Sequence, residues 1–258
     1  MEVIAVMSPK GGIGKTTTSD AIAYMLGEEH GKRVLIVDGD PQGDTSKTFR
    51  RYEPEGIGMS ELLGRHSGTR KTYRTSTYIQ PTEYPHIDII TANGYLMKTD
   101  MDLMARQDDK QITLFRHALS EVRNAYDYCI CDCGRLLDMV VINILIASDL
   151  IIAPVKVGGY ENEAVHNLQE QIEDLRCFNP ILRIKVLLTM RQKNKTSMEF
   201  ENWMRTESGF DVFEAAVHRS IITEKSTIAM MPVPAFAKNC IVSQDYRQVT
   251  AELLKELE

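Results

Sequence analysis

Gly12, Gly14, Lys15 and Thr16, near the start of the chain, have the types and spacing that hold a phosphate group. They belong to the stretch VMSPKGGIGKTTT, 6–18. Glycines let successive backbone N–H groups close around phosphate oxygens, and a helix beginning near Lys15 adds the positive end of its dipole. Lys15 can reach the terminal phosphates and the Thr16 hydroxyl can bind Mg²⁺. The stretch predicts a phosphate loop, with a structural glycine-rich turn as the alternative.

Two carboxylate-bearing segments follow apolar runs. VLIVDGDPQGDTS (34–46) contains Asp38 and Asp40, and YCICD (128–132) ends in Asp132. Carboxylates suit the water-rich coordination that Mg²⁺ keeps in proteins. A polar turn after a strand is the alternative interpretation of the 34–46 segment.

Short apolar runs alternate with helix-like segments along the chain, which predicts parallel strands joined by right-handed crossovers. The fold class expected is therefore α/β, with a doubly wound, mostly parallel sheet flanked by helices in one domain, 1–258. The expected strands are 3–7, 34–38, 87–90, 128–132, 150–155 and 186–190. The expected helices are Thr16–Glu28, Gln111–Asn124, Leu136–Ala147, Glu161–Phe178 and Val242–Leu257.

Residues 47–86 interrupt this alternation and are expected to form a surface insert with a short helix at Ser60–Leu63. The insert contains the basic stretch RHSGTRKTYR, 65–74. That stretch is interpreted either as a contact patch or as a solvated loop.

Composition limits the possible functions. The 258 residues carry a formal net charge of −6, so binding to nucleic acid would need a local basic patch. No apolar run approaches the ~18 residues of a membrane span, and no signal peptide is recognised, so a cytoplasmic location is expected. Cys129, Cys131 and Cys133 alternate along one predicted strand and would share one face. They are interpreted as small buried hydrophobes, with an iron–sulfur role as the alternative.

The segment KGGIGKTT resembles the deviant Walker A motif, K-G-G-x-G-K-[ST], of the ParA/MinD family of P-loop ATPases. Its Pro9 is compatible with that motif, and its additional lysine is Lys10. The 34–46 segment is similar to the family's D-x-D-P-Q-G segment, and 126–155 resembles its Walker B strand, helix and next strand. The resemblance implies a P-loop NTPase fold that uses ATP and Mg²⁺. The ATP-binding residues that it implies are Lys10, Gly11, Gly12, Ile13, Gly14, Lys15, Thr16 and Thr17.

The resemblance also implies roles for individual residues. In an ATP-sandwich homodimer, Lys10 would reach across the interface and contact the phosphates bound by the partner, as an arginine finger does. Lys10, Lys15 and Asp40 would be catalytic, with Asp40 orienting the attacking water. The Thr16 hydroxyl would bind Mg²⁺, Asp38 would help hold the hydration shell of the ion, and Asp132 would face it. Gly134-Arg135 stands where the family usually has two prolines, which is expected to loosen the loop beside the terminal phosphate.

The C-terminal third has weaker similarity, in VLLTMRQKNKTS (186–197) and VHRSIITEKS (217–226). It suggests a patch for nonspecific DNA contact, with a solvated surface as the alternative. The candidate patch residues are Arg191, Lys193, Lys195, Arg219 and Lys225.

The function implied is a DNA partitioning ATPase that dimerises with ATP, coats nucleoid DNA nonspecifically, and hydrolyses ATP slowly until a ParB-like or other partner activates it. No operator-binding domain is expected, because few residues precede the phosphate loop. One alternative is a MinD-like spatial regulator that positions a protein assembly or acts at a membrane surface. The acidic end VTAELLKELE argues against stable membrane binding. A metal–sulfur reductase or chelatase-type relative is a third hypothesis, which needs paired cysteines at a dimer axis.

Overall fold

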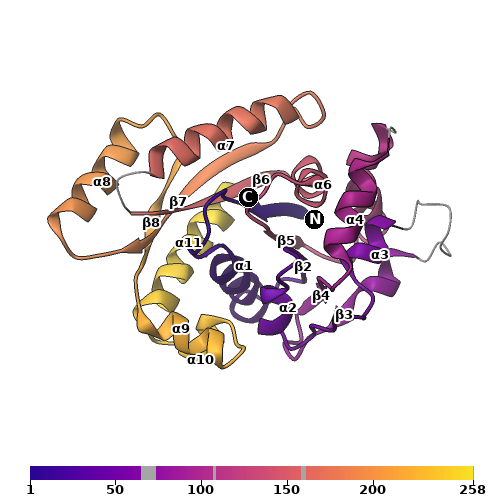
Figure 1. Ribbon diagram of the computed structural model, residues 1–258. Coiled ribbons are helices and arrows are strands. Elements are labelled where there is room, and N and C mark those ends of the chain that lie inside the picture. Colours follow the sequence, from indigo (N-terminus) through magenta and orange to yellow (C-terminus); the bar gives the residue numbers. More distant parts are fainter. Residues whose placement is uncertain (65–73, 107–108, 158–160, 258) are drawn as a thin grey trace.

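The computed structural model describes residues 1–64, 74–106, 109–157 and 161–257 and contains one eight-stranded sheet (Figure 1). The strand order is β3-β4-β2-β5-β1-β6-β7-β8, and all neighbours are parallel except β3 and β4. The strands are β1 (Glu2–Val6), β2 (Val34–Gly39), β3 (Gln80–Pro81), β4 (Ile87–Ile90), β5 (Tyr128–Cys133), β6 (Leu150–Lys156), β7 (Arg183–Arg191) and β8 (Val212–His218).

Helices cover both faces of the sheet, which confirms the doubly wound α/β class (Figure 1). The hydrophobic cluster on one face includes buried residues of α1 (Lys15–Tyr24), the π-helical turn η1 (Met25–Glu29), α10 (Val233–Phe236) and α11 (Ile241–Leu257). The cluster on the other face includes residues of α3 (Met59–Gly64), α4 (Leu96–Met104), α5 (Leu114–Ser120), α6 (Met139–Ala147), α7 (Glu161–Leu175) and α8 (Lys195–Thr206). The remaining elements are α2 (Asp44–Thr48), α9 (Ile221–Ile228), η2 (Thr75–Tyr78) and η3 (Asp109–Ile112).

The central strands β2, β5 and β1 bring the predicted site segments together. In the sheet register, Val6 pairs with Asp132 and Asp132 pairs with Asp38. The carboxyl ends of parallel strands meet at one edge, where α/β proteins bind ligands. The phosphate loop and both acidic segments therefore leave the sheet at the same edge.

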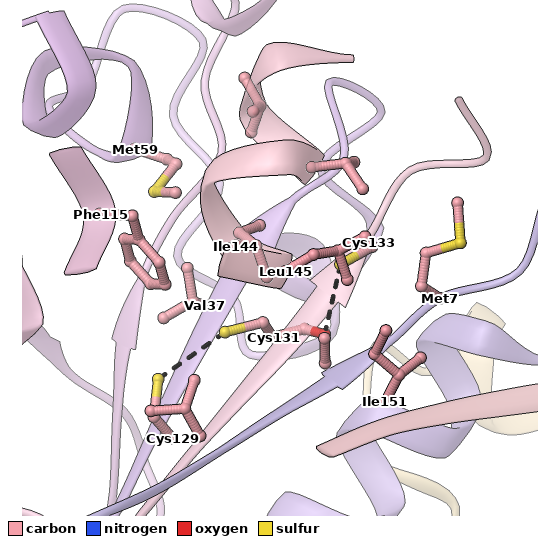
Figure 2. Packing of buried hydrophobic residues seen from close by; sticks show 14 of the residues in the cluster. Met7, Val37, Met59, Phe115, Cys129, Cys131, Cys133, Ile144, Leu145 and Ile151 are labelled. Carbon is pink, nitrogen blue, oxygen red and sulfur yellow. Dashed lines mark hydrogen bonds between the residues drawn. The ribbon is translucent and has the colours of Figure 1, made fainter. Parts of the chain in front are cut away.

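The three alternating cysteines of β5 are packed as small hydrophobes. Cys129, Cys131 and Cys133 are buried in the core, where Figure 2 shows them beside Val37 and Ile144. The Sγ atoms of Cys129 and Cys131 lie 3.8 Å apart, and neither forms a disulfide. Among the described residues, no group of three or more His, Cys, Asp or Glu side chains is arranged to hold a metal ion.

The segment expected as a surface insert, 47–86, contributes to the core where it is described. Phe49, Met59, Leu62 and Tyr78 are almost completely buried, and the predicted short helix is α3. These apolar side chains dock the segment against the sheet and α4, because their burial removes hydrocarbon from water. Of the basic stretch 65–74, residues 65–73 lie outside the described residues.

The six expected strands and five expected helices are all present, with ends that shift by a few residues. The sequence interpretation missed the helices α2, α4, α8, α9 and α10 and the edge strands β3 and β8. Strand β3 has two residues, and Glu214 interrupts the apolar run of β8, so neither shows the continuous apolar run that marks a strand buried on both faces. No helix in the described part of the chain has the length and apolar character needed to span a membrane.

Candidate nucleotide site

The loop after β1 has the backbone geometry of a phosphate cradle. Gly12 and Gly14 have φ angles of 69° and 90°, a left-handed region that residues with a Cβ rarely adopt. Gly14 caps α1, whose first turn is closed by a bond from Thr18 N to Gly14 O. The helix amino terminus therefore points its free N–H groups into the loop, where an anion is stabilised.

A cavity of about 850 Å³ opens directly in front of this loop. Its wall combines three parts of the chain that are distant in sequence: the phosphate loop with α1, the segment after β2, and the segment after β5. Met97 and Asp100 of α4 and the segment 226–233 complete the wall, the latter with the apolar side chains of Met230 and Met231. The lining residues used below are Gly11, Gly12, Gly14, Lys15, Thr16, Thr17, Asp20, Asp40, Asp100, Gly134, Arg135, Leu136, Asp138, Met230, Met231 and Pro232.

Asp132 is the centre of a buried network of hydroxyl groups behind the cavity. The Thr16 hydroxyl donates to Asp132 Oδ2 at 2.8 Å, and the Ser19 hydroxyl donates to Oδ1 at 3.0 Å. Thr45 Oγ1 lies 3.0 Å from Asp132 Oδ2 and 2.9 Å from Asp20 Oδ1. The network ties α1, β5 and α2 together around one carboxyl group.

Asp38 and Asp40, two residues apart, have different surroundings. Asp38 is fully buried, and its Oδ2 accepts from the backbone N and the hydroxyl of Ser46 at 2.7 and 2.6 Å. Asp40 lines the cavity, where its Oδ1 accepts from Gln42 N at 2.9 Å. A Cβ built on Gly134 would lie 3.8 Å from Asp40 Cγ, so the loop after β5 runs directly past this carboxyl group.

Burial and mutual repulsion perturb the acids at this edge of the sheet. Burial, reinforced by the charge of Asp132, raises the pKa of Asp38 to about 8. Burial also raises the pKa of Asp132 to about 6, although the three hydroxyl donors oppose the shift. The pKa of Asp20 lies well above its usual range for the same reason, burial first and the Asp132 charge second. This edge of the sheet therefore concentrates carboxyl groups whose charged forms are disfavoured by burial and by one another.

Lys15 is the cation that faces these acids. Its Nζ donates to the backbone O of Lys10 at 3.0 Å. Burial lowers the pKa of Lys15, while the carboxylates of Asp132 and Asp40 oppose that shift. The half-buried ammonium group is held at the loop, in position to contact a phosphate oxygen in the cavity.

A second pair of acids, Asp138 after β5 and Asp100 of α4, lies at the amino terminus of α6. Asp138 caps α6 by accepting from Val141 N at 2.9 Å, and Asp100 of α4 accepts from Met139 N at 2.7 Å. Burial raises the pKa of Asp138 to about 6. Arg135 and Leu136 line the cavity between these acids and Asp40, and the Leu136 side chain is 63% exposed. Arg135, whose role the sequence left open, is thus placed at the cavity wall.

The structure brings most of the predicted nucleotide and metal residues to one place. The glycines of the loop, Lys15, Thr16, Thr17 and Asp40 line the cavity, and Asp132 contacts Thr16 from behind. Lys10 and Ile13 are not among the lining residues. Ile13 is buried, and its backbone O accepts from the Thr189 hydroxyl at 2.8 Å. Asp38 does not reach the cavity either.

The predicted DNA patch is assembled only in part. Arg191 and Arg219 lie at the ends of adjacent strands, joined by a bond from Arg219 N to Arg191 O. The Arg191 side chain pairs with Glu201 of α8 at 2.8 Å, and the same carboxyl group also pairs with Arg205, so the charge of Arg191 is only partly compensated. Lys195 is 90% exposed and lies 3.6 Å from Glu199, while Lys193 and Lys225 are also exposed.

Sequence reasoning missed several residues of the site. Asp138 had a detectable signal, because an Asp directly before an apolar helical run is a helix-capping pattern. Thr45, Asp20 and the apolar wall at 230–232 carry no local motif. Their roles depend on contacts between segments that only the folded chain brings together.

Comparison with known proteins shows what this arrangement is similar to. The AAA domain family matches residues 1–184, which is well over half of the chain. The chain belongs to this family. A curated relative, the chromosome partitioning protein ParA of Caulobacter vibrioides, is 29% identical over 98% of this chain and 94% of the relative. The resemblance to ParA-type partitioning ATPases is thereby confirmed.

Two solved structures share the fold. Cobyrinic acid a,c-diamide synthase from Mycobacterium smegmatis, with bound ATP analogue and magnesium, superposes with a TM-score of 0.83 at 24% identity, covering 100% of this chain and 96% of the other. A plasmid partition protein from Borrelia burgdorferi, bound to AMPPNP, has a TM-score of 0.81 at 21% identity and covers 99% of both chains. The P-loop NTPase fold predicted from the sequence is thus confirmed, and both of these neighbours were captured with an ATP analogue.

Proposed function

We propose that this chain is an ATP-dependent DNA partitioning ATPase that forms an ATP-sandwich dimer, binds DNA nonspecifically, and hydrolyses ATP when a partner stimulates it. The observation that carries the proposal is the single cavity in which the phosphate loop, Lys15, Thr16 and Asp40 meet. The similarity to ParA of Caulobacter vibrioides over nearly the whole chain supports the partitioning role.

Several residues of the cavity have specific roles in this proposed function. The loop N–H groups and the amino terminus of α1 bind the phosphate oxygens, and Lys15 stabilises charge on the terminal phosphate. Asp40 projects into the cavity beside Gly134, where its carboxylate can accept a hydrogen bond from the attacking water and orient it. The apolar side at Met230 and Met231 suits the flat, weakly polar base of a nucleotide.

The residues present fit a magnesium ion that accompanies ATP. Thr16 offers a hydroxyl oxygen at the cavity wall, and Asp132 holds that hydroxyl at 2.8 Å from behind. Oxygen donors with acidic partners for bound waters are what Mg²⁺ prefers. Asp38 would act on the hydration shell at most, since its carboxyl group is buried and engaged with Ser46. When bound, the ion would neutralise negative charge on the phosphates.

Lys10 would serve the partner subunit. It stands in the loop but is not among the residues that line this chain's own cavity. That placement supports a role across a dimer interface, where the ammonium group would meet the phosphates of the second nucleotide. Hydrolysis would then depend on dimerisation, and the monomer alone would be a slow ATPase.

A MinD-like positioning role is the second candidate. Glu201 pairs with Arg191 and Arg205, and Glu199 lies 3.6 Å from Lys195, so acidic neighbours weaken part of the patch for contact with a DNA phosphate. Retention on random-sequence duplex that weakens steeply with salt would support the partitioning role. Flotation with anionic liposomes, or failure to bind duplex at low salt, would favour the alternative.

The decisive test has two measurements, each made in the presence of Mg²⁺. The rate of ATP hydrolysis is measured, and light scattering after gel filtration gives the oligomeric state with ATP or with ADP. Wild type is expected to dimerise with ATP only. Lys15→Ala should lose ATP binding, whereas Lys10→Ala should keep ATP binding and lose hydrolysis. Lys255→Ala, an exposed lysine of α11, is the matched control. Tight ATP binding by Lys15→Ala, or hydrolysis by Lys10→Ala at the wild-type rate, would contradict the proposal.

A further inference from the structure

Asp20 is a buried carboxyl group that neither the phosphate loop nor the predicted metal set explains. It lies on α1, one helical turn after Thr16, and is only 4% exposed. Burial of a carboxyl group is unfavourable unless hydrogen bonds compensate it. Its hydroxyl partner at 2.9 Å is Thr45, which belongs to a different element, α2, and the Thr48 side chain of the same helix also interacts with it.

Thr45 stands between two carboxyl groups. Its Oγ1 is 2.9 Å from Asp20 Oδ1 and 3.0 Å from Asp132 Oδ2. A hydroxyl has one proton, so it can donate to only one of them at a time. Asp132 keeps two other hydroxyl donors, Thr16 and Ser19, when Thr45 turns to Asp20. Asp20 is therefore a second acceptor for the Thr45 hydroxyl, and it can hold Thr45 when Asp132 is engaged by Thr16 and Ser19.

Thr45 follows directly on the turn that carries Asp40. The turn is closed by a bond from Gly43 N to Asp40 O at 2.9 Å, and α2 begins at the next residue. A helix of five residues has little stability of its own and depends on tertiary contacts. Fixing Thr45 to α1 therefore fixes the Asp40 turn relative to the phosphate loop.

We propose that Asp20 is a positioning residue for Asp40: through Thr45 it docks α2 against α1 and so places the Asp40 carboxyl group at the cavity. The inference rests on the ATP hydrolysis proposed above. The geometry of a reacting group matters greatly, because a displacement of about 1 Å can reduce a rate by ~100-fold. A partial loosening of α2 is expected to lower kcat by about tenfold and to leave KM for ATP within about twofold, since the phosphate loop itself is untouched.

The test uses two pairs of variants. Thr45→Val removes the hydroxyl at constant shape, and Thr45→Ser restores it. Asp20→Ala removes the acceptor, and Asp20→Asn restores an amide oxygen. The first variant of each pair should show the loss of kcat, and the second should remain within about threefold of wild type. Thr250→Val is the control, because the Thr250 hydroxyl is buried in α11 without a hydrogen-bond partner in the described structure.

Hydrogen–deuterium exchange of the ligand-free protein provides a readout that does not depend on ATP hydrolysis. Peptides covering 40–48 should exchange faster in Thr45→Val and Asp20→Ala, and at the wild-type rate in the two restoring variants. Unchanged exchange in this segment, or a kcat in Thr45→Val within twofold of wild type, would overturn the inference. If wild type hydrolyses no ATP, the proposed function fails, and the exchange result still decides whether Asp20 anchors α2.

Discussion

The buried acid Asp38 makes a quantitative prediction for the protein without nucleotide and metal. Its pKa is raised to about 8 by burial and by the charge of Asp132, whereas an unfolded chain has a value near 3.8. Between these values the folded state holds a proton that the unfolded state has released. The free energy of unfolding must then fall as the pH rises through this window.

The size of the effect follows from one proton. Each pH unit changes the free energy of unfolding by about 1.4 kcal/mol for each extra proton bound by the folded state. From pH 5.5 to 7.5 Asp38 should therefore contribute a loss of roughly 2–3 kcal/mol. Asp38→Asn removes this contribution, and its amide oxygen can still accept from Ser46. The variant should show a shallower pH dependence and a higher stability than wild type at pH 7.5.

The assay is urea denaturation at pH 5.5, 6.5 and 7.5, at constant ionic strength with a chelator. Asp127→Asn is the matched control, because Arg33 lowers the pKa of Asp127 to about 2, outside this range. The reasoning is refuted if wild type and Asp38→Asn have parallel pH dependences, or if the stability of wild type does not fall relative to the variant as the pH rises.

Three further predictions concern other parts of the site. Asp138→Ala should lower the free energy of unfolding by about 1 kcal/mol through loss of the α6 cap, and Asp138→Asn should restore most of it, by thermal or urea denaturation. Asp40→Ala should retain ATP and remain dimeric on gel filtration, so a monomer with bound ATP would contradict its assignment to hydrolysis. Lys193→Ala and Lys195→Ala, combined, should reduce the slope of log affinity for random duplex against log salt by up to about 2, whereas an unchanged slope would exclude both lysines from the phosphate contacts.

The fold was accessible from sequence where the signal is local. The buried strands β2 and β5 are nearly continuous apolar runs, and the phosphate loop consists of consecutive residues whose glycines determine its backbone. The sequence also predicted Asp40, directly after β2, and Thr16, directly after the phosphate loop, as site residues, and both line the cavity. Edge strand β8 and helix α8 were missed, because Glu214 interrupts the apolar run of β8 and most residues of α8 are polar.

Burial could not be deduced from residue type alone. The segment 47–86 is polar enough to predict a surface insert, yet its few apolar side chains, such as Phe49 and Met59, lie in the core. Conversely, Arg191 has the charge expected of a DNA contact, but its side chain pairs with Glu201, ten residues away on α8. Both outcomes depend on which neighbours the fold supplies.

The sequence by itself determined the family, the central strands and the phosphate loop, because each is encoded by residues adjacent in the chain. Tertiary structure alone decided that Thr16 meets Asp132 across 116 positions and that Thr45 lies between Asp132 and Asp20. It also decided that Asp38 turns away from the cavity while Asp40 enters it. The physical reason is that the environment of a carboxyl group, its burial and its hydrogen-bond donors, is set by distant segments that meet only when the sheet has formed.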